Sequence, residues 1–310
     1  MQIFVSGSLA YDRIMDFPGK FADHILPKKI HILNVCFLVN GLTEQFGGTA
    51  GNIAYSLSLL GEQPIILATS GKDFRRYGEW LQRQGLGLAG IRNIPEDFTA
   101  GAYITTDQVD NQITGFNPGA MKYPSLYQFS PDNSDPDVLA IIAPGNTEDM
   151  LVYSRRYKEL QIPYIFDPGQ QIPVLSAQEL TEMITGCKLL ISNDYELEMV
   201  KTATGLETQS LLDNCEAIIT TQGENGSMLL TKKETVRIPA VKADTVIDPT
   251  GAGDAYRAGM IKGLAMKKSL VDAARMGATC ASFAVEHRGT QVHNFDQSDF
   301  WTRHQNSFGE

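Results

Sequence analysis

Short, continuous apolar runs alternate with helical patterns along most of this chain, and this rhythm constrains its fold more than any other feature. The runs that could form strands are Ile3–Ser6, Ile65–Thr69, Val138–Ala143, Tyr164–Asp167, Leu189–Ser192 and Ile218–Thr221. They lack the alternation of a half-exposed strand, as expected for strands that are buried on both faces of a sheet. Between the first two, Ile53, Leu57 and Leu60 share one face of a predicted helix that ends at Gly61. The rhythm predicts an α/β fold with a doubly wound, mostly parallel sheet flanked by helices.

Two stretches interrupt this rhythm, residues 13–46 and 99–117. In the second, Gly101–Thr106 and Gln112–Phe116 surround an Asp-Asn turn, which predicts a β-hairpin. The two stretches form either a small β-sheet lid over the main site or extra edge strands of the main sheet. With a lid, residues 1–12, 47–98 and 118–310 make an α/β core domain that holds the site. The polar segment after Phe295 is expected to fray.

The net charge limits the binding partners that this protein can have, and the cysteine content indicates its cellular compartment. The 310 residues carry a formal net charge of -10, which disfavours nucleic acid and anionic membranes as partners. A phosphate ligand remains compatible, because backbone N–H groups and a metal ion can bind it. No signal peptide and no apolar run of about 18 residues is recognised. Four cysteines without a CxxC pair are expected to pack as small apolar residues in a reducing compartment. The sequence predicts a cytoplasmic protein, and it leaves the oligomeric state open, a homodimer included.

Each predicted strand ends in a polar or glycine-rich corner. The corners are Gly7-Ser8, Thr69-Ser70-Gly71, Pro144-Gly145-Asn146, Asp167-Pro168-Gly169, Asn193-Asp194 and Gln222-Gly223. Ligands of open α/β sheets bind at the carboxyl ends of the strands. The functional site is therefore expected at these corners.

The segment Asp248–Tyr256 carries the strongest chemical signal. It reads Asp-Pro-Thr-Gly-Ala-Gly-Asp-Ala-Tyr, and the residues from Ala255 onward predict a helix rich in small side chains. Amides at the start of a helix, together with its positive dipole end, stabilise an anion. Asp254 is therefore either an ordinary first-turn helix residue or a general base beside a bound phosphate. The motif as a whole favours the base.

Four motifs together resemble the PfkB, or ribokinase-like, family of sugar and nucleoside kinases. They are Phe46–Asn52 with the following helix, Asn193-Asp194-Tyr195-Glu196, Thr221–Gly226 and Gly251–Asp254. They stand in the order of the family, and the resemblance extends over nearly the whole chain. Its closest similarity is to bacterial adenosine and other nucleoside kinases. The resemblance implies a ribokinase-like fold and transfer of the γ-phosphate of ATP to a hydroxyl group.

The resemblance also implies roles for the catalytic residues. Asp254 would take the proton from the attacking hydroxyl, while the amides of Gly251, Ala252 and Gly253 would form an anion hole. Phosphoryl transfer depends chiefly on positioning and charge neutralisation, which such a site supplies.

The nucleotide side is implied in the same way. Asn193 would lie at the ATP site and, with Glu196, organise Mg²⁺ and its waters, although Asn-x-x-Glu is also a helix-capping signature. Thr221, Gly223 and Gly226 would line the ATP site, or form a simple β-turn.

The acceptor side involves the first strand and the first glycine-rich motif. Asp12 would accept hydrogen bonds from two vicinal hydroxyls, as a carboxylate can; the alternative is a solvated turn residue. Gly47, Gly48 and Asn52 match the segment that contacts the sugar in the family, where a β-sheet lid closes over the substrate.

Asp248 and Thr250 match positions that hold a monovalent cation such as K⁺ in many relatives. Pro249 stands where threonine is common and removes a hydroxyl and a backbone donor, so the sequence leaves the dependence on K⁺ open.

The acceptor predicted first is a ribonucleoside, with adenosine favoured. The stretch Phe116–Met121 is similar to one in nucleoside kinases. Tyr11, Tyr103 and Phe116 either present aromatic faces to a purine or pack in the core of the lid. Two alternatives are a sugar kinase acting on ribose or fructose and a non-catalytic nucleotide- or sugar-binding relative. A dinucleotide-dependent oxidoreductase is disfavoured, since G-x-G-x-x-G does not follow the first strand. No Walker A motif of a P-loop protein occurs either.

Overall fold

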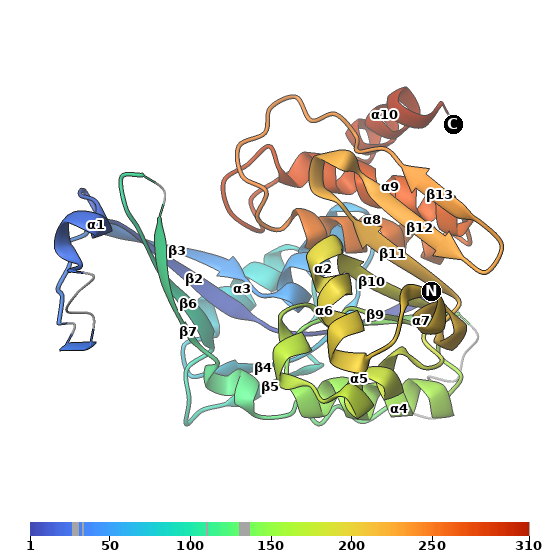
Figure 1. The fold of residues 1–310 in the computed structure, drawn as a ribbon, viewed down its shortest axis with the longest axis horizontal. Helices are drawn as coiled ribbons and strands as arrows, with labels where there is room; N and C mark the ends of the chain where they lie inside the picture. The colour runs from blue at the N-terminus through green and yellow to red at the C-terminus, as the bar shows by residue number, and fades with distance from the viewer. Residues whose placement is uncertain (27–30, 33, 110, 130–136, 310) are drawn as a thin grey trace.

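The computed structural model describes residues 1–26, 31–32, 34–109, 111–129 and 137–309, and a nine-stranded sheet runs through its centre (Figure 1). In spatial order the strands are β13 (Thr235–Ile238), β12 (Ser227–Thr231), β11 (Ala217–Thr221), β10 (Leu189–Asn193), β9 (Tyr164–Phe166), β8 (Val138–Ile142), β1 (Gln2–Ser6), β4 (Ile65–Gly71) and β5 (Ile91–Ile94). Neighbours from β11 to β5 pair in parallel, whereas β12 and β13 pair antiparallel at one edge. The six strands predicted from apolar runs are all present in this sheet.

Helices cover both faces of the sheet, because the strands bury both of their faces. In β8, Leu139 and Ile141 belong to one apolar core, while Val138, Ala140 and Ile142 belong to the other. The first core packs against α2 (Thr49–Leu59), α3 (Arg75–Arg83), α8 (Ala252–Ala265) and α9 (Leu270–Ala284). The second packs against α4 (Thr147–Glu159), α5 (Ala177–Ile184), α6 (Asp194–Thr204) and α7 (Thr208–Asn214). The predicted doubly wound architecture is confirmed.

A second, four-stranded sheet projects beside the main one (Figure 1). Its strands, in spatial order, are β3 (Asn40–Gly47), β2 (Ala10–Asp16), β6 (Ala100–Thr106) and β7 (Gln112–Asn117), and the short helix α1 (Phe21–His24) lies at its far end. The predicted hairpin is confirmed, with Thr106 opposite Gln112 and Gly101 opposite Asn117; Asp110 of its turn lies outside the described residues. The interrupting stretches therefore form a separate small sheet, the lid, and not extra edge strands. The division of the chain into two domains stays a prediction.

Two local expectations need correction. The polar segment after Phe295 does not fray but forms helix α10 (Gln297–Phe308), whose first turn is capped by Asp296. The helix buries Phe300 and His304, while most of its polar side chains are exposed. Cys187, Cys215 and Cys280 are buried as expected, whereas Cys36 is exposed. Within the described residues, none of the helices combines the length and the apolar character that a membrane span requires.

Candidate active site

A cavity of about 290 Å³ opens at the carboxyl ends of the central strands. Its walls come from the corners after β8 to β11 and from the starts of α2 and α8, and they consist of Thr49, Pro144, Asp167, Gly169, Gln170, Asn193, Glu196, Thr221, Gly251, Gly253, Asp254 and Arg257. The polar corners predicted from the sequence therefore meet in one place, because parallel strands place their carboxyl ends at the same edge of the sheet.

Helix α8 begins at this cavity. Gly251 precedes it in the left-handed conformation, with φ of +80°, which favours glycine at this position. Among the three predicted anion-hole donors, the Ala252 N–H already donates to the Pro249 carbonyl at 3.1 Å. Within the described part of the chain, the structure assigns no acceptor to the amides of Gly251, Gly253 and Asp254. Two of the three predicted donors, Gly251 and Gly253, are therefore free among the described residues, and the amide of Asp254 is free in place of Ala252.

The Asp254 side chain lines the cavity in the first turn of α8. Its Oδ2 accepts a hydrogen bond from Asn52 Nδ2 at 2.8 Å. Loss of hydration on burial raises the pKa of Asp254 to about 6, against the opposing effects of Arg257 and of the Asn52 hydrogen bond. The carboxylate is therefore ionised at neutral pH, with a pKa close enough to that pH for a general base.

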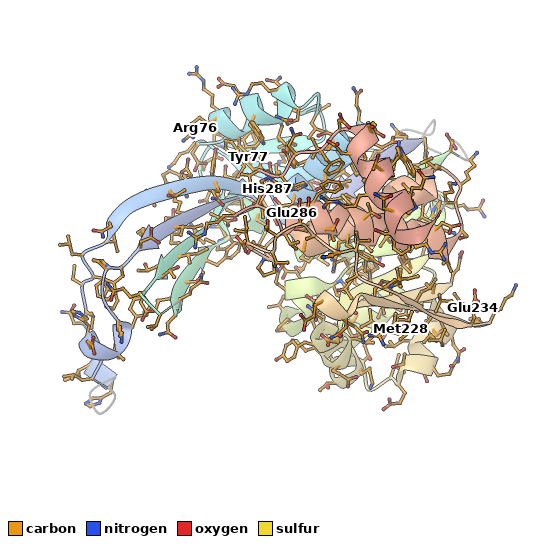
Figure 2. All side chains as sticks on the ribbon, turned by 90° about the horizontal axis from the view of Figure 1, so that it is seen from above. Arg76, Tyr77, Met228, Glu234, Glu286 and His287 are labelled. Carbon is orange, nitrogen blue, oxygen red and sulfur yellow. The ribbon has the colours of Figure 1, made fainter. Side chains whose placement is uncertain are left out.

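A chain of hydrogen bonds connects Asp254 to the base of the lid. Gln291 Nε2 lies 3.0 Å from Asn52 Oδ1 and 2.6 Å from the Tyr77 hydroxyl, and that hydroxyl donates to the Gly47 carbonyl at 2.7 Å. The indole of Trp80 donates to Gln291 Oε1 at 3.1 Å. Figure 2 shows Tyr77 on helix α3, where the small sheet joins the core. The sequence analysis missed Gln291, since no local motif marks it.

Asp12 lies on β2 of the lid, between Gln45 of β3 and Ala102 of β6. Burial raises the pKa of its carboxyl group, and the carboxylate in turn raises the pKa of Asp254. The structure gives the Asp12 side chain no hydrogen-bond partner among the described residues. A Cβ on Gly47 would lie 2.5 Å from Asp12 Oδ2, so a larger residue there would displace the Asp12 carboxylate. The neighbouring Gly48 has φ of +89°.

The aromatic residues predicted to face a purine separate into two groups. Phe116 on β7 is 53% exposed and Tyr103 on β6 is 40% exposed, so both present faces to solvent. Tyr11 is 2% exposed, packs against Phe46 and Tyr77, and donates its hydroxyl to the Asp73 carbonyl. For Tyr11 the structure bears out core packing and not a face presented to a purine, because its position in β2 turns the ring inward.

The Asn193–Glu196 segment forms a helix cap and lies at the cavity at the same time. Asn193 Oδ1 accepts from the Glu196 N–H at 2.7 Å, and Glu196 Oε2 accepts from the Asn193 N–H at 2.8 Å. Both side chains nevertheless line the cavity. The capping interpretation is therefore correct without displacing either residue from the site.

Thr221 lines the cavity, whereas the glycines that follow it form a turn around the 3₁₀ helix η5 (Gly223–Asn225). Gly223 is exposed with φ of +55°. A Cβ on Gly226 would lie 2.1 Å from the Ile238 carbonyl oxygen, which alone requires glycine there. Their proposed contact with ATP stays a prediction.

Asp248 holds the loop before α8. Its Oδ1 accepts from the Thr250 N–H at 2.9 Å and its Oδ2 from the Gly289 N–H at 2.8 Å. Burial opposes ionisation, but these hydrogen bonds outweigh it and lower the pKa of Asp248. In the part of the chain that the structure describes, there is no group of three or more His, Cys, Asp or Glu side chains that could hold a metal ion.

Arg257 is a cavity residue that the sequence analysis missed, whereas Asp167 was expected there only as part of a polar corner. Arg257 stands three residues after Asp254 on α8, and its Nε donates to Asp167 Oδ2 at the end of β9. Its Nη1 donates to the Gly253 carbonyl at 2.9 Å. The two side chains are only 8% and 3% exposed. The signal available in the sequence was the i, i+3 spacing, which places Arg257 beside Asp254 on the helix surface.

Comparison with known proteins identifies the family. Residues 19–296 match the pfkB family of carbohydrate kinases. A nucleoside kinase of Methanocaldococcus jannaschii is 33% identical over 261 residues, which are 84% of this chain and 85% of that protein. The structure of a Burkholderia thailandensis nucleoside kinase in complex with inosine is 35% identical, with a TM-score of 0.87 over 99% of this chain and 98% of that one. The chain therefore belongs to the pfkB family of carbohydrate kinases, and it is an ATP-using phosphotransferase with a hydroxyl group as acceptor.

Proposed function

We propose that this protein transfers the γ-phosphate of ATP to the primary hydroxyl of a ribonucleoside. The observation that carries the proposal is the placement of two half-buried carboxylates, Asp12 in the lid and Asp254 at the start of α8. Asp12 has no hydrogen-bond partner among the described residues and can accept from two vicinal hydroxyls. Held by its 2′- and 3′-hydroxyls, a ribosyl ring would direct its 5′-hydroxyl to Asp254. The inosine bound to the Burkholderia relative supports a nucleoside as acceptor.

In the proposed reaction, Asp254 accepts the proton of the attacking hydroxyl as the new O–P bond forms and the bond to ADP breaks. Its pKa of about 6 suits proton transfer near neutral pH. The amides of Gly251, Gly253 and Asp254 would donate to the transferring phosphate at the positive end of α8. Asn193 and Thr221 would contact the rest of the ATP phosphates from the opposite wall of the cavity.

Metal ions would complete the charge balance of the site. Glu196 lines the cavity and offers the oxygen ligand type that Mg²⁺ prefers, so it would hold a water of the Mg²⁺ that accompanies ATP. That ion would neutralise phosphate charge. Asp248 and Thr250 would hold K⁺ only if the loop oxygens around them remain accessible, because both Asp248 carboxylate oxygens already accept backbone hydrogen bonds.

The small sheet of residues 13–46 and 99–117 would close over the acceptor and exclude water, which limits wasteful hydrolysis of ATP. Phe116, exposed on its β7 strand, would then stack on the base, while Gly47, Gly48 and Asn52 contact the ribose. The core, predicted as residues 1–12, 47–98 and 118–310, would carry the ATP and catalytic groups. Residues 10–12 of that prediction lie in β2 of the small sheet, so Asp12 would reach the acceptor from the lid. Three buried free cysteines suit the reducing cytoplasm in which we expect the protein to act.

The decisive experiment measures ADP release with adenosine, inosine, cytidine, 2′-deoxyadenosine, ribose and fructose at equal concentration. Ribonucleosides should be the best acceptors, with adenosine expected first. Loss of one hydroxyl from the Asp12 contact should lower kcat/KM for the 2′-deoxy compound by about 10–150-fold, since hydrogen bonds to charged groups contribute about 1.5–3 kcal/mol. Ribose or fructose outrunning every nucleoside would establish the sugar-kinase alternative instead. No ADP release with any acceptor, despite ATP binding, would support the non-catalytic one.

A further inference from the structure

The residues that line the cavity carry more negative than positive charge, which is unfavourable for a site that binds a polyanion such as ATP. Three carboxylates line it, Asp167, Glu196 and Asp254. Among the lining residues that the structure describes, only Arg257 carries a positive charge. ATP brings several more negative charges, and placing them against carboxylates in a partly dehydrated cavity is costly without a cation.

The Arg257 guanidinium is fixed in place and not free to fold away. Asp167 binds its Nε from the end of β9, and the Gly253 carbonyl binds its Nη1 from the first turn of the same helix. A Cβ on Gly253 would lie 2.9 Å from Nη1, so this glycine allows the guanidinium to lie directly against the backbone of the free amides. The structure assigns no partner to Nη2 within the described residues, and the side chain lines the cavity.

We propose that Arg257 is a phosphate-binding residue, whose free Nη2 contacts the γ-phosphate of ATP beside the amides of Gly253 and Asp254. Asp167 then acts as a positioning residue, because it holds the guanidinium through Nε and leaves Nη2 directed to the ligand. Its other oxygen, Oδ1, is buried and has no hydrogen-bond partner in the described chain. This inference rests on the proposed function in one respect, namely that the cavity takes ATP.

Arginine suits the binding of a phosphate group at this position better than an isolated lysine would. Its planar guanidinium can donate to a carboxylate, to a backbone carbonyl and to a phosphate at the same time. The pairing with Asp167 also explains why a guanidinium is tolerated in a buried position, since an unpaired buried charge is strongly unfavourable.

The test compares Arg257→Gln, Asp167→Asn and the double variant, with dissociation constants for ATP and ADP, kcat on inosine, and Tm. Arg257→Gln alone leaves Asp167 buried without its cation and is expected to lower Tm. The double variant removes both charges and should recover Tm, yet its ATP affinity should remain about 10–150-fold weaker, the range for a hydrogen bond to a charged group. Its ADP affinity should change by less than a factor of about three, because ADP has no γ-phosphate. Asp167→Asn keeps the cation but loosens its positioning, so ATP affinity should weaken, though by less than in the double variant.

A matched control removes another ion pair of α8 that does not line the cavity. Lys262 Nζ lies 2.6 Å from Glu62 Oε1, and both side chains are largely buried. The Lys262→Gln, Glu62→Gln double variant should change neither ATP affinity nor kcat.

If the Asp167→Asn, Arg257→Gln enzyme recovers wild-type kcat and ATP affinity along with Tm, the pair is structural only and the proposal is overturned. Equal weakening of ATP and ADP would also overturn it. Failure of wild-type enzyme to phosphorylate any nucleoside would refute the proposed function instead, and the ATP and ADP affinities would still decide the role of Arg257.

Discussion

Asn52 Nδ2 donates a 2.8 Å hydrogen bond to Asp254 Oδ2, although the two residues stand 202 positions apart in the chain. The bond joins the first turn of α2, which follows the glycine-rich motif, to the first turn of α8, which follows the second one. Gln291 Nε2 donates a hydrogen bond to Asn52 Oδ1, which fixes the orientation of the Asn52 amide group. The carboxylate of Asp254 is thereby held toward the cavity in one rotamer. This arrangement and the groups around it lead to five expectations.

Asp254→Asn should lower kcat by about 10²–10⁴-fold, the usual contribution of a general base. ATP affinity should change little, because the amides that would bind the phosphate remain. Single-turnover kinetics and ATP titration measure the two effects separately. A variant that retains more than about a tenth of wild-type kcat would exclude Asp254 as the base.

The same substitution should stabilise the protein at alkaline pH. The folded pKa of Asp254, about 6, is higher than the usual 3.8 of an aspartate, so its ionisation destabilises the fold progressively as the pH rises between these values. Asn stays neutral, and Asp254→Asn should therefore gain up to about 3 kcal/mol at pH 8, since each pKa unit corresponds to about 1.4 kcal/mol. The gain should vanish below about pH 4. Chemical denaturation at pH 4 and pH 8 measures it, and an equal effect at both values would contradict the raised pKa.

Asn52→Ala should move the acid limb of the kcat/KM profile to higher pH. The Asn52 hydrogen bond lowers the pKa of Asp254, so its loss should raise that pKa above its present value of about 6. Gln297→Ala serves as a control, because its amide donates to Leu59 at the opposite end of α2. The control should leave the profile unchanged. An acid limb at the same pH in Asn52→Ala would refute the coupling.

Glu196→Gln should raise the Mg²⁺ concentration for half-maximal rate without lowering Tm. A glutamine can still accept the Asn193 N–H and maintain the capping box, whereas it binds the waters of Mg²⁺ less strongly than a carboxylate. Rates over a Mg²⁺ titration, with Tm measured in parallel, separate the two roles. If only Tm falls, the residue is a helix cap and no more.

Gly47→Ala should raise KM for the nucleoside while ATP affinity stays constant. The added Cβ would lie 2.5 Å from Asp12 Oδ2 and displace the carboxylate from the acceptor. Gly87→Ala is the matched control, since no heavy atom lies within 4 Å of the Cβ position there. Steady-state kinetics with nucleoside and ATP varied in turn provide the measurement. An unchanged KM would remove Asp12 from the acceptor site.

The sequence by itself determined the elements that depend on local pattern. Continuous apolar runs such as Val138–Ala143 predicted buried parallel strands, and two alternating segments around a turn predicted the β6–β7 hairpin. The glycines before Asp254 predicted a helix start with free amides. The structure explains the glycine at position 251, because its φ of +80° favours this residue. The meeting of the polar corners in one cavity also followed, since parallel strands end at the same edge. All of these depend on residues close together in the chain or on the handedness of strand crossovers.

Only the tertiary structure decided which distant side chains meet. Arg257 and Asp167 are 90 residues apart, and Gln291 reaches Asn52 across 239. Neither pair has a local signature, because the direction of each side chain depends on strand register and on how the helices pack. The same reason accounts for Tyr11, whose sequence neighbourhood is that of a surface turn but whose ring the register of β2 places against Phe46 and Tyr77. Local backbone preferences act within a few residues, whereas the electrostatics of this site result from contacts that form only when the two glycine-rich helix starts face each other across the cavity.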